Sequence, residues 1–398
     1  MKQKIFIALF ALGLSVVLHG YLTAHYYPLQ LGFGGAPSLC SVGAKFDCDA
    51  VSASPYAAIF GIPVAAFGAV YNLILFVMVL FNWLGLRGDS ARNWREPFWM
   101  SIGSVAATLI MGTITLTKLS SACLFCIGAY VLSLIAFGAL LLAQSESPWK
   151  FLGSDLRAWF TEQKSFLLWL AAVPIGAGLV HIGMMQNYGA EELSRVVKGS
   201  INDWQTGPSV TWTATPSLTK GASVENAKLT LTEFADFRCG HCKHAAPSLK
   251  AFVNANPDVR LVFYSFPLDS TCNPALKHGD GISCHLAKLV ICAAQQDRGW
   301  QAHDQIFENQ EKFQALSTPE TINTELKSRM TEQNLDWAAM NTCLKDPATE
   351  ANLRAQAEQG VAAKVMGTPS IYANGKKLEK AQLLPVLSAL KASLSDQK

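Results

Sequence analysis

The first 186 residues of this 398-residue chain are poor in charged side chains. They carry 17, whereas residues 187–398 carry 44. Lipid tolerates few ionised groups within a spanning helix, while a soluble domain exposes many. The sequence therefore predicts an α-helical membrane bundle followed by a water-soluble domain. The net charge is +3, and no cluster of Lys and Arg is interleaved with aromatic residues, so nothing favours nucleic-acid binding.

Five apolar runs are long enough to cross a bilayer, which takes about 20 helical residues. The first follows Lys2 and Lys4 and has a cleaved signal peptide as its alternative. A retained anchor is favoured because the run is long and no clear small-x-small site follows. Gly61-Ile62-Pro63 falls early in the second run, where proline removes no helical hydrogen bond. The predicted spans are residues 5–27, 57–82, 98–117, 124–143 and 165–186.

Polar side chains inside these runs have two interpretations each. His19 and His181 are more typical of packing or interfacial residues than of ligands. Asn72 either lines a pocket for a polar ring or donates a hydrogen bond to a neighbouring helix.

Cationic residues predict the orientation of the bundle. They flank the amino end, follow the second span and follow the fourth, and by the positive-inside tendency these segments face the cytoplasm. The opposite side has only Lys45 and, at its border, Lys118. An odd number of spans then places the carboxyl-terminal half outside the cytoplasmic (inner) membrane, in the periplasm. The cytoplasmic cations are Lys2, Lys4, Arg87, Arg92, Arg95, Lys150, Arg157 and Lys164.

Ten cysteines, mostly grouped in pairs, indicate an oxidising compartment. Cys40 and Cys48 lie in the loop of residues 28–56, and Cys123 and Cys126 open the fourth span on the same predicted side. A Cys-x-x-Cys pair can close a disulfide across one turn, and a helix N-terminus lowers the pKa of its first thiol. The alternative is that these are small hydrophobic side chains packed between helices. The shared side favours a redox site at the outer surface.

These elements together resemble the vitamin K epoxide reductase family over about residues 5–143. The matching elements are Cys40 and Cys48, the run Cys48-Asp49-Ala50-Val51 with Ser54, Phe60-Gly61-Ile62-Pro63, and Cys123-x-x-Cys126 followed by Tyr130. The resemblance implies a four-helix catalytic core and a membrane quinone as electron acceptor, with no metal. Ubiquinone or menaquinone is expected from the bacterial relatives, and phylloquinone stays open. Cys126 would reduce the quinone, and Ser54 and Tyr130 would lie beside its ring.

The second half contains its own Cys-x-x-Cys pair. Residues 229–234 alternate like a strand and lead to Cys239-Gly240-His241-Cys242, which opens a helical stretch through Phe252. The Cys239 thiolate would lie at the helix N-terminus, where protonated His241 adds positive charge. Further elements are a strand at residues 259–266, a helix-rich insertion at 283–364, a cis-proline turn at Thr368-Pro369 followed by a strand, and a closing helix at 380–394.

Residues 226–396 resemble the thioredoxin superfamily, and the helical insertion is similar to that of its DsbA-type branch. The resemblance implies that Cys239 exchanges with client proteins, that Cys242 resolves the mixed disulfide, and that a buried Glu233 accepts the proton of Cys242. An exposed carboxylate at the strand end is the alternative for Glu233. His241, Thr368 and Pro369 would contact the substrate.

Four cysteines remain in the second half, and structural disulfides are the favoured use. We expect Cys272 with Cys284 and Cys292 with Cys343, one of three possible pairings. A zinc site with His278 and His285 is the alternative, but no tight Cys-x-x-Cys spacing accompanies these histidines.

The predicted organisation is a catalytic membrane domain (1–143), a cytoplasmic loop with a fifth span (144–186), a linker with one short helix near residues 191–198 (187–225) and a thioredoxin-like domain (226–398). The predicted function is a quinone-dependent thiol oxidase that forms disulfides in secreted or periplasmic clients. Electrons would pass from Cys239 and Cys242 to Cys40 and Cys48, then to Cys123 and Cys126, and then to the quinone pool. The fused thioredoxin-like domain is thus the expected partner. The alternatives are a membrane-fed disulfide isomerase or reductase, and a non-enzymic membrane-tethered chaperone module.

Overall fold

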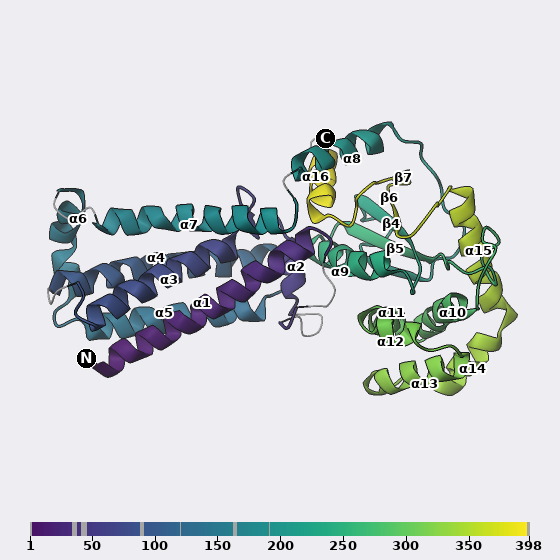
Figure 1. Cartoon of the computed structure of the whole chain (residues 1–398), viewed down its shortest axis with the longest axis horizontal. Helices are drawn as coiled ribbons and strands as arrows, with labels where there is room; N and C mark the ends of the chain where they lie inside the picture. The colour runs from purple at the N-terminus through teal and green to yellow at the C-terminus, as the bar shows by residue number, and fades with distance from the viewer. Residues whose placement is uncertain are drawn as a thin grey trace. The chain divides into compact units, whose positions relative to one another are not determined.

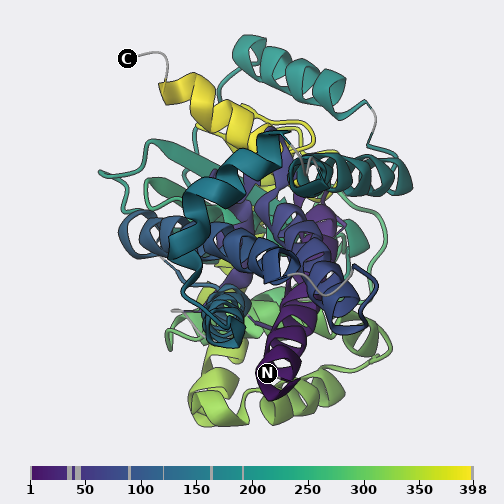
Figure 2. The same ribbon diagram turned by 90° about the vertical axis from the view of Figure 1, so that its left-hand side faces the viewer.

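The computed structural model describes residues 2–33, 38–40, 46–87, 91–119, 121–161, 165–190 and 192–395. Lys45 and Lys164, two of the cations used to orient the bundle, lie outside these residues. The chain divides into two compact units, Met1–Leu29 with Ser38–Glu191, and Gln30–Pro37 with Glu192–Lys398. Both units appear in two perpendicular views (Figure 1 and Figure 2).

The first unit is a bundle of long apolar helices. Within the described residues, five helices have the length and composition needed to cross a membrane. Helix α3 packs against α4 and α7, and α4 packs against α5 (Figure 1). The core between them is apolar, with fully buried Ile5, Leu12, Leu75, Met78, Phe98 and Leu140. The five helices are α1 (Lys2–Gln30), α3 (Val64–Trp83), α4 (Ala91–Lys118), α5 (Leu124–Ala143) and α7 (Ser165–Asn187).

The second span begins later than the sequence predicted. Helix α3 starts at Val64 instead of residue 57, because residues 58–63 form a small hairpin of β1 (Ala58–Ile59) and β2 (Ile62–Pro63). Phe60 and Gly61 make its two-residue turn with φ of 52° and 82°, a conformation that suits glycine. Pro63 then precedes the helix in an extended conformation. The Gly61-Ile62-Pro63 motif therefore lies before the span and not within it.

The third span begins earlier than predicted, at Ala91 instead of residue 98, because the charges of its first turns are paired. Asp155, on α6 (Leu152–Thr161), accepts two hydrogen bonds of 2.7 Å from Arg95 and one of 3.1 Å from Trp99. Arg92 lies 3.7 Å from the same carboxylate, and Arg87 pairs with Glu96. A buried charge is tolerated when a partner with good geometry neutralises it.

The second unit is built on a mixed sheet with the strand order β3-β5-β4-β6-β7. Strands β4 and β5 are parallel, with Leu231 opposite Leu261, and the other pairs are antiparallel. Helix α9 (Gly240–Ala255) makes the crossover between β4 and β5 that a parallel pair needs. The strands are β3 (Leu218–Gly221), β4 (Leu229–Ala235), β5 (Val259–Ser265), β6 (Ser370–Ala373) and β7 (Lys376–Lys377).

The predicted helical insertion is present between β5 and β6, and α16 (Leu384–Ser395) closes the unit (Figure 1). The insertion buries much of the apolar core of this unit, including Leu286, Leu289, Ile306, Phe313 and Leu326. Its helices are α10 (Ile282–Ala294), α11 (Gly299–Glu308), α12 (Gln310–Gln314), α13 (Pro319–Arg329), α14 (Trp337–Lys345) and α15 (Pro347–Ala362).

Residues 187–225 contain more structure than the expected linker. The short helix predicted near residues 191–198 is α8, which spans Leu193–Thr206 and buries Trp204. Strand β3 pairs with β5 along Leu218–Gly221 and buries Leu218. An edge strand of four residues with Thr and Lys carries little apolar signal, so its sequence resembles that of a loop.

Candidate active site

A short helix brings the first cysteine pair beside the start of α5. Helix α2 (Cys48–Ala53) is capped by Asp47, whose side chain accepts a 3.0 Å hydrogen bond from the Ala50 amide. The backbone amide of Asp47 in turn donates to the Ala122 carbonyl at 3.0 Å. The start of α2 is therefore fixed next to the residue that precedes Cys123.

Two disulfides lie in contact at this point. Cys40 is bonded to Cys48, and Cys123 is bonded to Cys126. The Sγ atoms of Cys48 and Cys123 are 3.4 Å apart, and those of Cys40, Cys48 and Cys123 all lie within 4.8 Å of one another. Reacting atoms about 3–3.5 Å apart are close to an attack geometry. A thiolate released at Cys48 would therefore face the second disulfide directly.

Cys123 occupies the N-cap position of α5, and its sulfur accepts a 3.1 Å hydrogen bond from the Cys126 amide. The amide groups of a helix N-terminus favour negative charge. A thiolate formed at Cys123 would be stabilised by the same backbone groups.

Cys40, in the predicted outer loop of residues 28–56, is fully buried. It packs in a cluster with Leu22, Cys48 and Cys123. Exchange with a soluble thiol therefore requires Cys40 to become exposed.

Hydrogen bonds hold the residues before Cys40 in place. The Leu39 amide donates to the Tyr21 hydroxyl at 2.8 Å, and the Ser38 amide donates to Asp49 at 3.2 Å. Asp49 also pairs with His25 at 2.8 Å. Burial opposes ionisation of Asp49, but its bonds with His25 and Ser38 outweigh burial and hold its pKa below the ordinary value.

A cavity of about 450 Å³ lies beside Cys126. It is within the size range of small-molecule sites, and its lining is largely apolar. Ser54 and Tyr130 line it together with Cys126, so three residues selected from the sequence meet at one cavity. The Ser54 hydroxyl donates to the Val51 carbonyl at 2.7 Å, and Tyr130 interacts with Thr115.

The cavity wall also contains His19, which the sequence pattern assigned to packing or the interface, and Asn72, for which a pocket was one of two interpretations. Asn72 donates to the Gly68 carbonyl of its own helix at 2.8 Å and not to a neighbouring helix. Its Oδ1 atom is buried without a hydrogen-bond partner. A polar residue inside an apolar run has the same sequence pattern whether it faces a helix or a cavity, so only the three-dimensional packing identifies it.

The second unit presents a separate dithiol. Cys239 and Cys242 are free thiols, and Cys239 is half-buried at the N-cap of α9 while Cys242 is fully buried. The Cys239 sulfur lies 3.2 Å from the carbonyl of Thr368, which precedes Pro369 through a cis peptide bond. Gln310 of the helical insertion donates to the Cys239 carbonyl at 2.9 Å and so helps to fix the backbone of Cys239.

The two thiols differ strongly in acidity. A hydrogen bond from Cys242, helped by Thr368 and by the first amides of α9, lowers the pKa of Cys239 to about 6 against the opposing effect of burial. Burial raises the pKa of Cys242 well above its ordinary value. Cys239 is therefore the thiol of the pair that ionises more readily.

Glu233, on β4, is 2% exposed, so it is not the exposed strand-end carboxylate of the alternative interpretation. Burial, and then the negative charge of Cys239, raises its pKa to about 8. Its Oε1 atom has no hydrogen-bond partner, and its charge contributes to the raised pKa of Cys242. This carboxyl group can exchange a proton near neutral pH.

The residues expected to contact substrate lie around Cys239 in different environments. His241 is exposed on the first turn of α9. Thr368 and Pro369 are half-buried, and the Thr368 hydroxyl has no hydrogen-bond partner.

Asp236 is a further buried acid that sequence patterns did not single out. It accepts hydrogen bonds from the amides of Arg238 and Leu268, both at 2.5 Å, and from the Ser283 hydroxyl at 3.2 Å. It therefore ties the loop before Cys239 to the start of α10. Burial raises its pKa.

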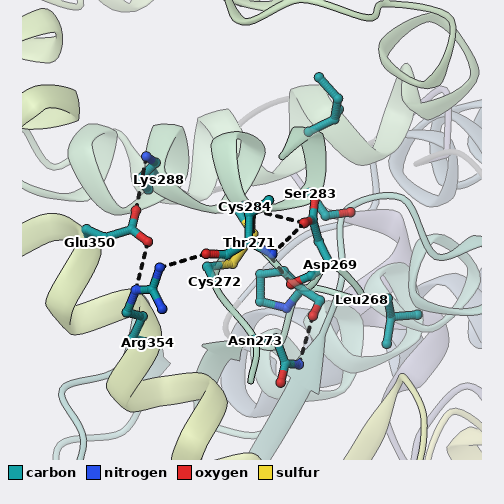
Figure 3. The surroundings of a disulfide bond; sticks show 12 residues. Leu268, Asp269, Thr271, Cys272, Asn273, Ser283, Cys284, Lys288, Glu350 and Arg354 are labelled. Carbon is teal, nitrogen blue, oxygen red and sulfur yellow. Dashed lines mark hydrogen bonds and ion pairs between the residues drawn. A yellow bond between two sulfur atoms is a disulfide. The ribbon is translucent and has the colours of Figure 1, made fainter. Parts of the chain in front are cut away.

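The remaining cysteines form disulfides between Cys272 and Cys284 and between Cys292 and Cys343. Figure 3 shows the first of these beside Asp269 and Ser283. The Thr271 hydroxyl donates to Asp269 at 2.8 Å and lies 3.0 Å from the Cys284 sulfur. Cys284 of this disulfide directly follows Ser283, whose hydroxyl donates to Asp236.

Comparison with known proteins gives matches in both halves of the chain. Residues 4–141 match the vitamin K epoxide reductase family, and residues 219–390 match the thioredoxin family. Probable disulfide bond formation protein D of Bacillus anthracis is 27% identical over 161 residues, which cover 38% of this chain and 67% of that protein.

Two further matches concern only part of the molecule. The Na(+)/H(+) antiporter NhaA 3 of Salinispora tropica is 23% identical over 163 residues, which cover 41% of this chain but only 22% of the antiporter. The crystal structure of oxidised BdbD from Bacillus subtilis has a TM-score of 0.37 and 20% identity, and covers 47% of this chain and 98% of that one.

Proposed function

We propose that this chain, which joins a vitamin K epoxide reductase family domain to a thioredoxin-like domain, is a quinone-dependent thiol oxidase. Both families support a role in disulfide-bond formation. The observation that carries the finer proposal is the 3.4 Å contact between Cys48 and Cys123. This contact places the Cys40–Cys48 disulfide next to the Cys123–Cys126 disulfide, and Cys126 lines an apolar cavity.

Electrons enter at the thioredoxin-like domain. A client thiolate attacks the oxidised Cys239–Cys242 pair, a second client thiol completes the client disulfide, and the pair is left as a dithiol. The Cys239 thiolate then attacks Cys40 and releases Cys48 as a thiolate. Cys242 attacks Cys239, restores its disulfide and releases Cys40.

The membrane domain passes the same two electrons onward. Cys48 attacks Cys123 and releases Cys126, and Cys40 then attacks Cys48 and releases Cys123. The Cys123–Cys126 pair is now reduced, with Cys126 at the cavity. A bound quinone supplies the final acceptor of two electrons and two protons.

The residues around the cavity fit such a ring. The wall is largely apolar, as a quinone ring and its isoprenoid chain require, and it carries few polar groups. Tyr130 would donate to a carbonyl oxygen where negative charge develops, with Ser54 beside it. The unpartnered Oδ1 of Asn72 is a further polar contact that a ligand can satisfy.

The proposed setting is the cytoplasmic membrane, with the thioredoxin-like domain in the periplasm. Its clients would be secreted or periplasmic proteins with reduced cysteines. Ubiquinone and menaquinone are the proposed acceptors.

The test is oxidation of a reduced two-cysteine peptide by the purified full chain in detergent, without oxygen, with a short-chain ubiquinone or menaquinone analogue. We expect one quinone reduced for each peptide disulfide formed. Continued peptide oxidation, beyond the disulfides that the chain itself holds, without quinone reduction would refute the oxidase proposal.

Two variants separate the domains. Cys239→Ala should abolish peptide oxidation but keep quinone reduction by dithiothreitol, whereas Cys126→Ala should lose both. Equal loss of both activities in Cys239→Ala would contradict the relay. A Cys239–Cys242 pair trapped mainly reduced in cells would favour the isomerase or reductase, and full activity of Cys126→Ala would favour the non-enzymic module.

A further inference from the structure

A compact polar patch interrupts the apolar wall of the cavity beside Cys126. It consists of His19 from α1 and of Gly68 and Asn72 from α3. The imidazole edge lies against Gly68 so closely that a Cβ atom there would be 2.2 Å from Cδ2 and 2.4 Å from Nε2 of His19. Only glycine permits this approach, and the position of the ring is therefore determined by packing.

Hydrogen bonds determine which nitrogen of His19 carries the proton. Nδ1 lies 2.8 Å from the Ser15 carbonyl, which can only accept, so Nδ1 is the protonated nitrogen of the neutral ring. The Ser15 hydroxyl, 3.3 Å away, is the second neighbour of Nδ1. The lone pair therefore lies on Nε2, at the ring edge that packs against Gly68, and His19 is one of the residues that line the cavity.

Asn72 presents a second acceptor on the same patch. Its Nδ2 donates to the Gly68 carbonyl at 2.8 Å, which leaves Oδ1 as the free end of the amide. Oδ1 is buried without a partner, and the side chain is only 3% exposed. With His19 neutral, the patch offers two acceptors and no donor to a ligand.

A quinone oxygen only accepts hydrogen bonds, whereas the hydroxyl of the reduced quinol donates one. Neutral His19 thus suits the product, and His19 with a proton on Nε2 suits the substrate. We propose that His19 is the acid that delivers a proton to one oxygen of the quinone during its reduction. This inference rests on the proposed function and identifies a catalytic residue within it.

The electrons and protons of this reduction come from the thiols of Cys123 and Cys126. The S–H bonds of Cys123 and Cys126 break and one S–S bond forms, which releases two electrons and two protons. Neutral His19 takes up one of these protons on Nε2 and delivers it to one quinone oxygen, so the ring is neutral again at the end. The other thiol proton goes to the second quinone oxygen. The net reaction is one dithiol and one quinone to one disulfide and one quinol.

The main test is His19→Gln, which keeps a hydrogen-bonding group but cannot carry a proton between partners. Quinone reduction driven by dithiothreitol should fall about 100-fold, as for other general acids. The dissociation constant of the oxidised ubiquinone analogue should change by about tenfold or less. A single turnover of peptide oxidation without quinone should keep the wild-type rate, because that step uses only disulfides.

The matched control is His181→Gln on α7. His181 bonds to the Tyr27 hydroxyl at 2.9 Å and is not part of the cavity wall, so this variant should retain wild-type quinone reduction. A second variant, His19→Ala, leaves space for a free imidazole. Added imidazole should restore its rate at least about tenfold, which a purely structural role of His19 would not allow.

The outcomes separate the two proposals. If the wild-type chain neither binds nor reduces a quinone analogue, the proposed function fails and this inference fails with it. If the wild type reduces quinone and His19→Gln is equally fast, only the role of His19 is overturned. The same conclusion follows if His19→Ala binds the analogue but imidazole does not restore its rate.

Discussion

Cys239 and Cys242 are three positions apart, yet their thiols differ in acidity. Hydrogen bonding lowers the pKa of Cys239, whereas burial raises the pKa of Cys242. The folded reduced domain holds Cys239 with a pKa of about 6, below its ordinary 9.0. The stabilisation from this thiolate is fully present above pH 9 and is lost as the pH falls through 6. The oxidised domain has no such thiolate. Its stability relative to the reduced form should therefore increase as the medium is acidified.

The first prediction concerns the origin of this acidity. The largest cause of the low pKa is the hydrogen bond from Cys242, so Cys242→Ala should raise the pKa of Cys239. The pH dependence of alkylation by iodoacetamide measures this shift directly. As a control, His244→Ala, one turn along α9, should leave the midpoint of the wild type near 6. An unchanged midpoint in Cys242→Ala would assign the acidity to the helix amides alone.

The second prediction concerns Glu233, whose folded pKa of about 8 lies above its ordinary 4.5. This difference destabilises the fold increasingly as the pH rises from 4.5 to 8. Glu233→Gln should therefore raise the free energy of unfolding, by about 4 kcal/mol at pH 8 and little at pH 4. The same variant should slow release of the mixed disulfide by about tenfold or more, because Cys242 loses a proton acceptor.

Denaturation of Glu233→Gln at both pH values, with quenched-flow trapping of the mixed disulfide, checks this expectation. A loss of stability at pH 8 would contradict it.

At this scale the sequence identified the residues that belong to motifs. The spacing of Cys40, Cys48, Cys123 and Cys126 led to cysteines that lie together in the structure. His19 and Asp236 were not identified as site residues, and for Asn72 the sequence left a pocket and a helix contact as equal alternatives. Each is a single polar residue whose partners come from distant parts of the chain, and no local spacing records such contacts.

Among the helices and strands, the sequence predicted the existence of elements better than their ends. Helix α3 begins at Val64 because a hairpin precedes it, and α4 begins at Ala91 because Asp155 on another helix neutralises its arginines. Strand β3 exists because β5 provides its partner. In each case the deciding interaction is tertiary, so a window of local hydrophobicity could not detect it.

The third prediction concerns the loop closed by Cys272 and Cys284 (Figure 3). A disulfide across 12 positions stabilises by about 3 kcal/mol by restricting the unfolded chain. The double variant Cys272→Ser with Cys284→Ser should lower the protection of α10 amides against hydrogen exchange by this amount. It should also change the alkylation rate of Cys239, because neighbouring Ser283 supports Asp236.

The matched control is Cys292→Ser with Cys343→Ser, which opens a disulfide across 51 positions. It should destabilise the same region by about 4 kcal/mol but leave the reactivity of Cys239 unchanged. Equal effects of the two double variants on Cys239 would argue against a specific link through Asp236.

For the whole molecule, the predicted resemblance to both families is confirmed, as is the combination of a helical bundle with a thioredoxin-like domain. The charge asymmetry predicted the two halves, and the two Cys-x-x-Cys motifs indicated a redox site in each. Both features can be read from neighbouring residues without knowledge of tertiary contacts. Transfer between the domains stays a prediction, since it depends on Cys40, which is buried in this state.

The fourth prediction tests that transfer. In Cys242→Ala the Cys239 thiolate can still attack Cys40, but no thiol remains to resolve the product, so a Cys40–Cys239 disulfide should accumulate. Peptide mapping under non-reducing conditions detects it. Adding Cys40→Ser should remove the crosslink, whereas Cys292→Ser with Cys343→Ser should not. A Cys242→Ala chain that never forms this bond would exclude Cys40 as the entry point.

The contact between Cys48 and Cys123 also makes the membrane domain a small reservoir of oxidising equivalents. Its two disulfides, Cys40–Cys48 and Cys123–Cys126, can each take up an electron pair before any quinone arrives. A fully oxidised chain mixed anaerobically with excess reduced peptide should therefore give a burst larger than one peptide disulfide per molecule. Secretion could then outpace the diffusion of lipid-soluble carriers for a short time without leaving clients unpaired.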